Sequence, residues 1–68
     1  MTTKLIVHLR VYRAQAKLTQ AELANLIGVS RKTINTIENG VFTPSTTLAL
    51  TLAKALNCSV HDLFALPE

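Results

Sequence analysis

The residue types best suited to chemistry in this sequence gather in one short segment, residues 31–38. At about 100° per residue, Thr33, Ile34 and Ile37 fall on one side of an α-helix, which predicts a buried face. The other side carries four polar residues: Arg31, Lys32, Asn35 and Thr36. Guanidinium, ammonium, amide and hydroxyl groups of this kind bind base edges and phosphates. The pattern therefore predicts a helix that presents a nucleic-acid-binding face.

A preceding predicted helix, residues 19–27, must position that face. At its start the Thr19 hydroxyl can accept from the backbone N–H of Glu22, whose carboxylate can reach back to Thr19, which is a capping box. Gly28 supplies the positive φ that a tight C-terminal turn needs, and Ser30 is suited to cap the next helix. Two short helices joined by a tight turn are therefore expected.

Three further helices are predicted from apolar residues at helical spacing, over residues 4–16, 46–56 and 60–64. The beginning of the first is ambiguous. Residues 2–7 are also rich in β-branched residues and could form a short strand, with the helix beginning near His8. The tail after the last helix contains a proline and is predicted to be non-helical.

Length and composition indicate one small domain covering residues 1–68. The chain is 49% hydrophobic but has only one tyrosine, two phenylalanines and no tryptophan, so its core must consist of aliphatic residues. A mean hydropathy of +0.30 is high for so short a chain and suggests an apolar partner surface, most simply a second copy. The first 32 residues hold six of the seven Lys and Arg residues against one Glu, which favours a polyanionic partner.

Several classes of function find no support in the sequence. The single Cys58 excludes an internal disulfide, and we expect a buried thiol. His8 and His61 lie far apart without other ligand types at metal spacing, so no metal is expected. There is no Gly-rich phosphate loop and no catalytic constellation, which argues against an enzyme, a cofactor or a small-molecule ligand. No apolar run is long enough to cross a membrane, and we expect a cytoplasmic protein.

The sequence resembles the Cro/cI-type helix-turn-helix repressors, also called the xenobiotic-response-element family. The matching residues are Gln20, Ala24, Gly28, Val29, Ile34 and Ile37, then Glu38-Asn39-Gly40, Pro44-Ser45, the Leu-Ala-Leu pattern from Leu48, and Asp62-Leu63. The resemblance implies an all-α, five-helix lambda-repressor-like fold with its helix-turn-helix core at residues 19–39. In very short members of this kind, residues before the first helix pair with the C-terminal tail as a small two-stranded hairpin.

The resemblance also implies roles for individual residues in sequence-specific binding of double-stranded DNA. Helix 31–38 would lie in the major groove, and its base-contacting residues would be Arg31, Lys32, Asn35 and Thr36. Gln20 would bind a phosphate and brace this helix. The full set expected at phosphates is Gln20, Thr19, Ser30, Thr33, Asn39 and Thr43. Arg13 and Glu38 match a structural salt bridge between the first and third helices, although their types alone would also fit an exposed pair.

One departure from the family pattern concerns the loop after the third helix. Residues 41–43 carry no Lys or Arg, so phosphate contacts there would have to come from backbone N–H groups, Thr43 or Phe42.

The resemblance further implies a homodimeric repressor on a pseudo-palindromic operator with half-sites about 34–36 Å apart. The candidate dimer contacts are the late apolar residues Leu50, Phe64 and Leu66, although Leu63 and Phe64 could instead close the core. An alternative function is an antitoxin-type module that neutralises a partner protein and binds DNA secondarily. The short tail favours the repressor.

Overall fold

Hydroxyl side chains mark the beginning of four of the five helices in the computed structural model, which describes residues 4–67. Thr19, Ser30, Ser45 and Ser59 each accept a hydrogen bond from the backbone N–H three residues further on. The helices that they cap are α2 (Gln20–Ile27), α3 (Arg31–Glu38), α4 (Thr46–Ala55) and α5 (Val60–Leu63). Each such cap stabilises a helix by about 1 kcal/mol, so local sequence sets these boundaries.

The first helix is the exception, because it follows a strand instead of a cap. Strand β1 (Ile6–Val7) precedes α1 (Leu9–Gln15), and His8 makes no side-chain cap hydrogen bond. Of the two alternatives for this segment, the structure therefore has the short strand. Residues 2 and 3 of the predicted strand lie outside the described residues.

Strand β1 pairs with β2 (Phe64–Ala65) in the predicted hairpin of the chain ends. The pairing is antiparallel, with Ile6 opposite Ala65 and Val7 opposite Phe64. The backbone N–H of His8 adds a hydrogen bond of 2.8 Å to the carbonyl of Leu63. This pairing corrects the extent of the last helix. Phe64 was expected to be helical, but its φ of −135° is that of a strand.

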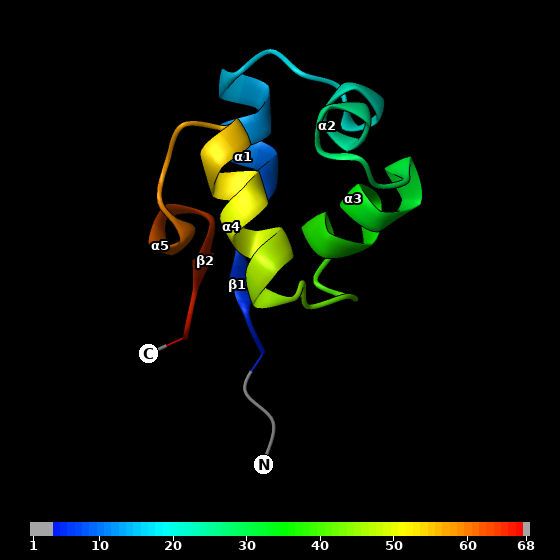
Figure 1. Cartoon of the computed structure of the whole chain (residues 1–68). Helices are drawn as coiled ribbons and strands as arrows, with labels where there is room; N and C mark the ends of the chain where they lie inside the picture. The colour runs from blue at the N-terminus through cyan, green and yellow to red at the C-terminus, as the bar shows by residue number, and fades with distance from the viewer. Residues whose placement is uncertain (1–3, 68) are drawn as a thin grey trace.

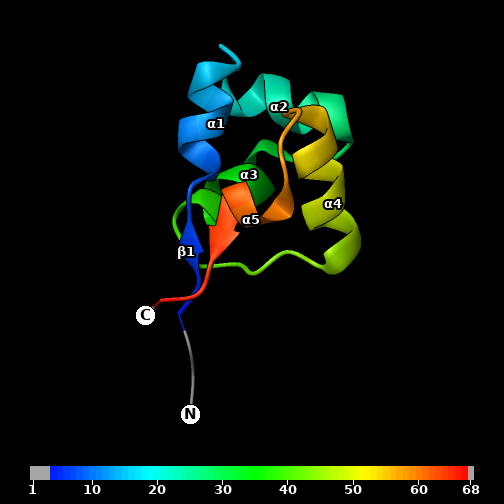
Figure 2. The ribbon, with the colours of Figure 1, turned by 90° about the vertical axis from the view of Figure 1, so that its left-hand side faces the viewer.

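The helices pack around an aliphatic core to which each of them contributes. The completely buried side chains are Leu9, Leu23, Ile34, Ile37, Leu52 and Leu63. Helices α1 and α4 lie in the middle of the molecule, with α2 and α3 on one side and α5 with β2 on the other, while β1 lies below α1 (Figures 1 and 2). The predicted arrangement of five helices with a hairpin formed by the chain ends is therefore confirmed. None of the helices among residues 4–67 has the length and apolar character to cross a membrane.

Candidate nucleic-acid interface

The turn between α2 and α3 fixes how the third helix is presented. Gly28 ends α2 with φ of 78° and ψ of 32°, the left-handed region that favours glycine. The backbone N–H groups of Gly28 and Val29 both donate to the carbonyl of Ala24. Ala24 is only 3% exposed, and its small side chain lets α3 cross α2 closely. The turn and the crossing are therefore both held by local contacts.

Helix α3 buries one face and exposes the polar one. Ile34 and Ile37 are completely buried. On the opposite face Arg31 and Lys32 are exposed, while Asn35 and Thr36 are partly buried. The predicted site residues thus share one accessible side of the helix.

The first turn of α3 concentrates positive charge. Arg31 and Lys32 occupy this turn, which holds no acidic residue. Within residues 4–67 neither side chain forms an ion pair. The unpaired N–H groups and the dipole of a helix N-terminus also attract anions. The geometry is that of an anion-binding surface with two cations available for a ligand.

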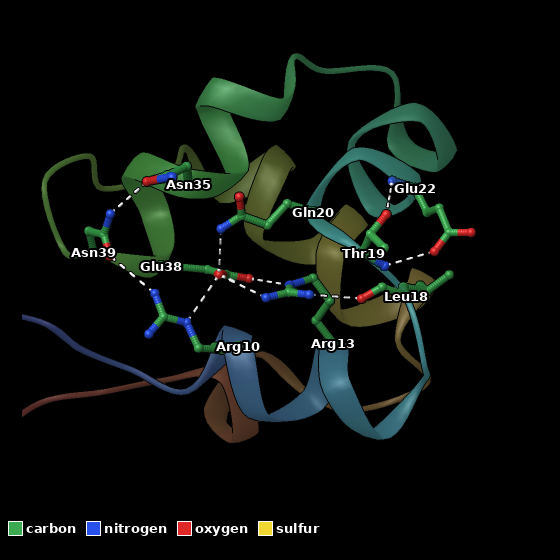
Figure 3. A network of polar contacts seen from close by, with 9 residues as sticks. All are labelled: Arg10, Arg13, Leu18, Thr19, Gln20, Glu22, Asn35, Glu38 and Asn39. Atoms are coloured by element: carbon green, nitrogen blue, oxygen red, sulfur yellow. Dashed lines mark hydrogen bonds and ion pairs between the residues drawn. The ribbon is translucent and has the colours of Figure 1, made fainter.

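Two other arginines of the basic half form ion pairs with one carboxylate, that of Glu38 at the end of α3 (Figure 3). Arg13 Nε donates to Glu38 Oε2 at 2.6 Å, and Arg13 Nη2 donates to Oε1 at 3.2 Å. Arg10 Nε lies 3.4 Å from Glu38 Oε1. The Glu38 side chain has no exposed surface, whereas that of Arg13 is 15% and that of Arg10 is 62% exposed. The expected pair of Arg13 and Glu38 is therefore present and lies largely inside the fold.

The same carboxylate extends the network to α2. Gln20 Nε2 donates to Glu38 Oε1 at 2.9 Å, and Arg13 Nη1 donates to the carbonyl of Leu18 at 2.8 Å. Glu38 thereby joins α1, α2 and α3. The expected bracing by Gln20 is a direct bond to Glu38, and one N–H of its amide remains for another partner.

The protonation of Glu38 follows from these neighbours. Burial by itself raises the pKa of this carboxyl, but hydrogen bonds from Arg13 and Gln20, the charge of Arg13 and a hydrogen bond from Arg10 outweigh it, so the pKa is lowered. The same hydrogen bond from Arg13 to Glu38 raises the pKa of the guanidinium. At neutral pH the pair is therefore fully ionised and holds the scaffold together.

Arg10 is a member of this network that the sequence patterns did not single out. Its Nη2 donates to Asn39 Oδ1 at 3.2 Å, and Asn39 Nδ2 donates to Asn35 Oδ1 at 2.6 Å. The chain of contacts runs from α1 to the polar face of α3 (Figure 3). The signal was its position three residues before Arg13, on the same face of α1.

The loop after α3 engages several of the backbone N–H groups that were expected to be available for a phosphate. The N–H groups of Val41 and Phe42 donate to the carbonyl of Thr36 at 2.9 and 3.2 Å, and that of Gly40 donates to Ile37 at 3.0 Å. These donors face the end of α3 and are not available to a ligand. Thr43 is exposed and stays a candidate.

The hydroxyl groups expected at phosphates are partly engaged in caps. Thr19 Oγ1 accepts from the backbone N–H of Glu22, and Ser30 Oγ accepts from that of Thr33. The hydroxyls of Ser30 and Thr33 also pair with each other at 2.9 Å. These residues lie at the N-termini of α2 and α3, where a phosphate would approach.

The candidate dimer residues differ in exposure. Leu50 is 57% and Leu66 is 72% exposed, whereas Phe64 is 7% exposed and belongs to the core. The ring of Phe64 has little exposed surface for a partner, because it packs in the hydrophobic core. The alternative that Phe64 closes the core is the one that the structure shows.

Two other expectations concern cysteine and metal. Cys58 is partly buried instead of fully buried; burial, together with the charge of Asp62, raises the pKa of its thiol. Residues 4–67 contain no group of three His, Cys, Asp or Glu side chains placed to hold a metal ion.

Comparison with known proteins assigns this fold and surface to a family. A helix-turn-helix family model matches residues 9–63. A helix-turn-helix-type transcriptional regulator of Methanocaldococcus jannaschii is 46% identical over 56 residues, which is 82% of this chain and 85% of that protein.

Two crystal structures have the same fold. The restriction-modification controller protein C.AhdI of Aeromonas hydrophila superposes with a TM-score of 0.76 at 36% identity, over 82% of this chain and 81% of that one. The clp gene regulator ClgR of Corynebacterium glutamicum gives a TM-score of 0.74 at 35% identity, over 79% of this chain and 57% of that one. The chain belongs to the Cro/cI-type helix-turn-helix family of DNA-binding transcriptional regulators.

Proposed function

We propose that the protein is a repressor that binds double-stranded DNA sequence-specifically, with α3 in the major groove. The observation that carries the proposal is the exposed first turn of α3, where Arg31 and Lys32 have no carboxylate partner among residues 4–67. Cations at a helix N-terminus destabilise a free protein by about 0.3–1 kcal/mol. Their placement is explained by a polyanionic ligand, whose phosphates and base edges they contact.

In this proposal one set of residues contacts bases and another contacts phosphates. Base edges are contacted by Arg31, Lys32, Asn35 and Thr36. Phosphates are contacted from the two helix N-termini and the loop, by Gln20, Thr19, Ser30, Thr33, Asn39 and Thr43. The bond between Gln20 and Glu38 supports this division, because it ties a phosphate contact on α2 to the end of the reading helix.

A homodimer on a pseudo-palindromic operator is part of the proposal. One α3 helix reads only a few base pairs, and a two-fold dimer doubles the site. Apolar surface is available for a second copy. A hollow of about 390 Å³ beside the hairpin is lined by Leu5, Val60, His61, Phe64, Ala65 and Leu66. The exposed Leu66 at its rim supports a contact there, and the exposed Leu50 on α4 is a second candidate.

The same arguments favour a binding protein over an enzyme. A DNA-binding role also favours a cytoplasmic location, where an operator is accessible. An antitoxin-type partner remains the alternative, and no contact among the described residues favours it over DNA.

The test is selection of bound sequences from a random duplex pool, followed by affinity measurements on the selected duplex at increasing salt. Because each phosphate contact releases counterions, affinity should fall steeply and linearly on a log–log plot. Absence of duplex binding at low salt would overturn the proposal.

Three variants separate the roles. Arg31→Ala should lose about 1–3 kcal/mol of discrimination between bases at one position, which is the value of a good bidentate contact. Gln20→Ala should weaken all sequences alike. Lys54→Ala, an exposed lysine on α4, is the control and should change neither. Equal losses on all sequences for Arg31→Ala and Gln20→Ala would make Arg31 a phosphate contact only.

A further inference from the structure

A hollow of about 350 Å³ lies between the first turns of α3 and the loop that follows this helix. Its lining residues are Ser30, Lys32, Thr33, Thr36, Val41 and Phe42. Val41 is 77% exposed and Phe42 is 46% exposed, so two apolar side chains stand in solvent beside the polar face of α3. Exposed apolar groups rimmed by polar ones are a feature of contact sites, and this pair is small in area.

Hydrogen bonds hold the loop against the helix and engage most polar groups of the hollow. The backbone N–H groups of Val41 and Phe42 both donate to the carbonyl of Thr36. The Thr36 hydroxyl donates to the carbonyl of Thr33 at 3.0 Å, and the Thr33 hydroxyl pairs with that of Ser30. The groups left to meet a ligand are mainly methyl groups, the Phe42 ring and the Lys32 ammonium at the rim.

This chemistry selects among the groups that DNA offers. A phosphate needs N–H or hydroxyl donors, and those of the loop from Gly40 to Phe42 face the helix. Among the base edges of the major groove, the apolar group is the 5-methyl of thymine, for which Phe and Thr methyl groups are suited. Lys32 at the rim adds attraction for the neighbouring backbone charge.

We propose that this hollow receives the 5-methyl group of a thymine, so that Val41 and Phe42 determine a preference for thymine at one position of the bound sequence. The inference rests on the proposed function, since it requires α3 to lie in the major groove. It assigns to an uncharged loop the reading of a base instead of the holding of a phosphate.

The experiment compares the selected duplex with duplexes in which each thymine in turn is replaced by 2′-deoxyuridine, which removes only the methyl group. At one position of each half-site the wild-type dissociation constant should rise about fourfold, the ratio expected for exposing one buried methyl group. If no position shows such a rise, the hollow does not bind a thymine methyl and the inference is wrong.

Variants of the loop locate the effect. In Phe42→Ala the thymine-to-uracil ratio at that position should fall below about twofold, while the ratios at other positions stay unchanged. Val41→Ala should lower the same ratio by a smaller amount, because valine is the smaller contact. Circular dichroism confirms that each variant is folded. If Phe42→Ala leaves the thymine-to-uracil ratio unchanged, the assignment is wrong. An equal loss of affinity on all sequences would also overturn it, because it would indicate contact with deoxyribose instead of a base.

The two proposals fail in distinguishable ways. Loss of all salt-dependent duplex binding would overturn both. Salt-dependent binding that is sensitive to Arg31→Ala but indifferent to every thymine methyl would leave the DNA-binding proposal standing and overturn this one.

Discussion

At the scale of single residues, Glu38 decides which cations of the chain are available. Its two oxygens accept from Arg13, Arg10 and Gln20, so both arginines of α1 are turned toward the scaffold. Arg31 has no such partner among residues 4–67. The family resemblance predicted the pair of Arg13 and Glu38. It did not predict Arg10, for which the only local signal is its position one turn before Arg13 on the same face of α1.

The first prediction concerns the loss of this carboxylate. Glu38→Gln keeps the shape of the side chain but leaves the Arg13 guanidinium, 15% exposed, without a counter-charge. Removing one partner of a buried pair costs about 3 kcal/mol or more, and unfolding in urea at pH 7 measures that loss. The matched control is Arg10→Gln, whose side chain is 62% exposed and whose loss should cost less than about 1 kcal/mol. Equal costs for both variants would show that the pair is not structural.

The same variant has a pH signature. The pKa of Glu38 is lowered in the fold, so its contribution to stability is present above the ordinary value of 4.5 and is lost as pH falls through the folded pKa. Glu38→Gln lacks this contribution, and its stability should fall less steeply than that of the wild type below about pH 4.5. The pKa of Asp62, lowered by its hydrogen bonds with Ser59 at the start of α5, adds an acid-sensitive contribution common to both proteins. Parallel curves of unfolding free energy against pH would contradict the role of Glu38.

At the scale of elements, residue patterns indicate the local features, whereas the non-local hairpin was implied only by the family resemblance. The caps at Thr19, Ser30 and Ser45 involve residues three positions apart, and the helices begin where these caps predict. The hairpin pairs residues 6–7 with residues 64–65, nearly the whole chain apart. Strand and helix therefore stayed open alternatives at the first segment. The residues around Phe64 do not indicate its strand conformation, because its partner Val7 lies at the other end of the sequence.

The prediction at this scale concerns the turn that sets α3 against α2. At Gly28 a Cβ atom would meet nothing within 4 Å, so Gly28→Ala is opposed only by the φ of +78°. A non-glycine residue in this conformation costs roughly 1–2 kcal/mol, which should appear as reduced stability in thermal unfolding. Asn25→Ala, at an exposed position of α2, is the control and should be neutral or stabilising by less than about 0.7 kcal/mol. A neutral Gly28→Ala would mean that the turn adopts another conformation in solution.

At the scale of the whole molecule, the proposed reading surface lies on a different side from α5 and β2, whereas β1 lies below α1 (Figures 1 and 2). Helices α2 and α3 lie to one side of α1 and α4, and α5 with β2 lies to the other (Figures 1 and 2). A dimer formed through the side of α5 and β2 would leave α3 free to meet DNA. The composition indicated an excess of apolar surface, but only the fold shows that Phe64 is buried in the core while Leu66 is exposed.

The last prediction tests this arrangement through the mass of the protein in solution. Sedimentation equilibrium should give twice the mass of one chain, and Leu66→Glu should weaken dimerisation by about tenfold or more, because a carboxylate would be buried without a partner. Leu50→Glu tests the second candidate contact in the same way. Leu26→Glu is the matched control, since Leu26 is 61% exposed on α2, outside the proposed interface, and should leave the mass unchanged. A wild-type monomer that still selects a palindromic duplex would show that pairing occurs only on DNA. A monomer that selects a single half-site would overturn the dimer.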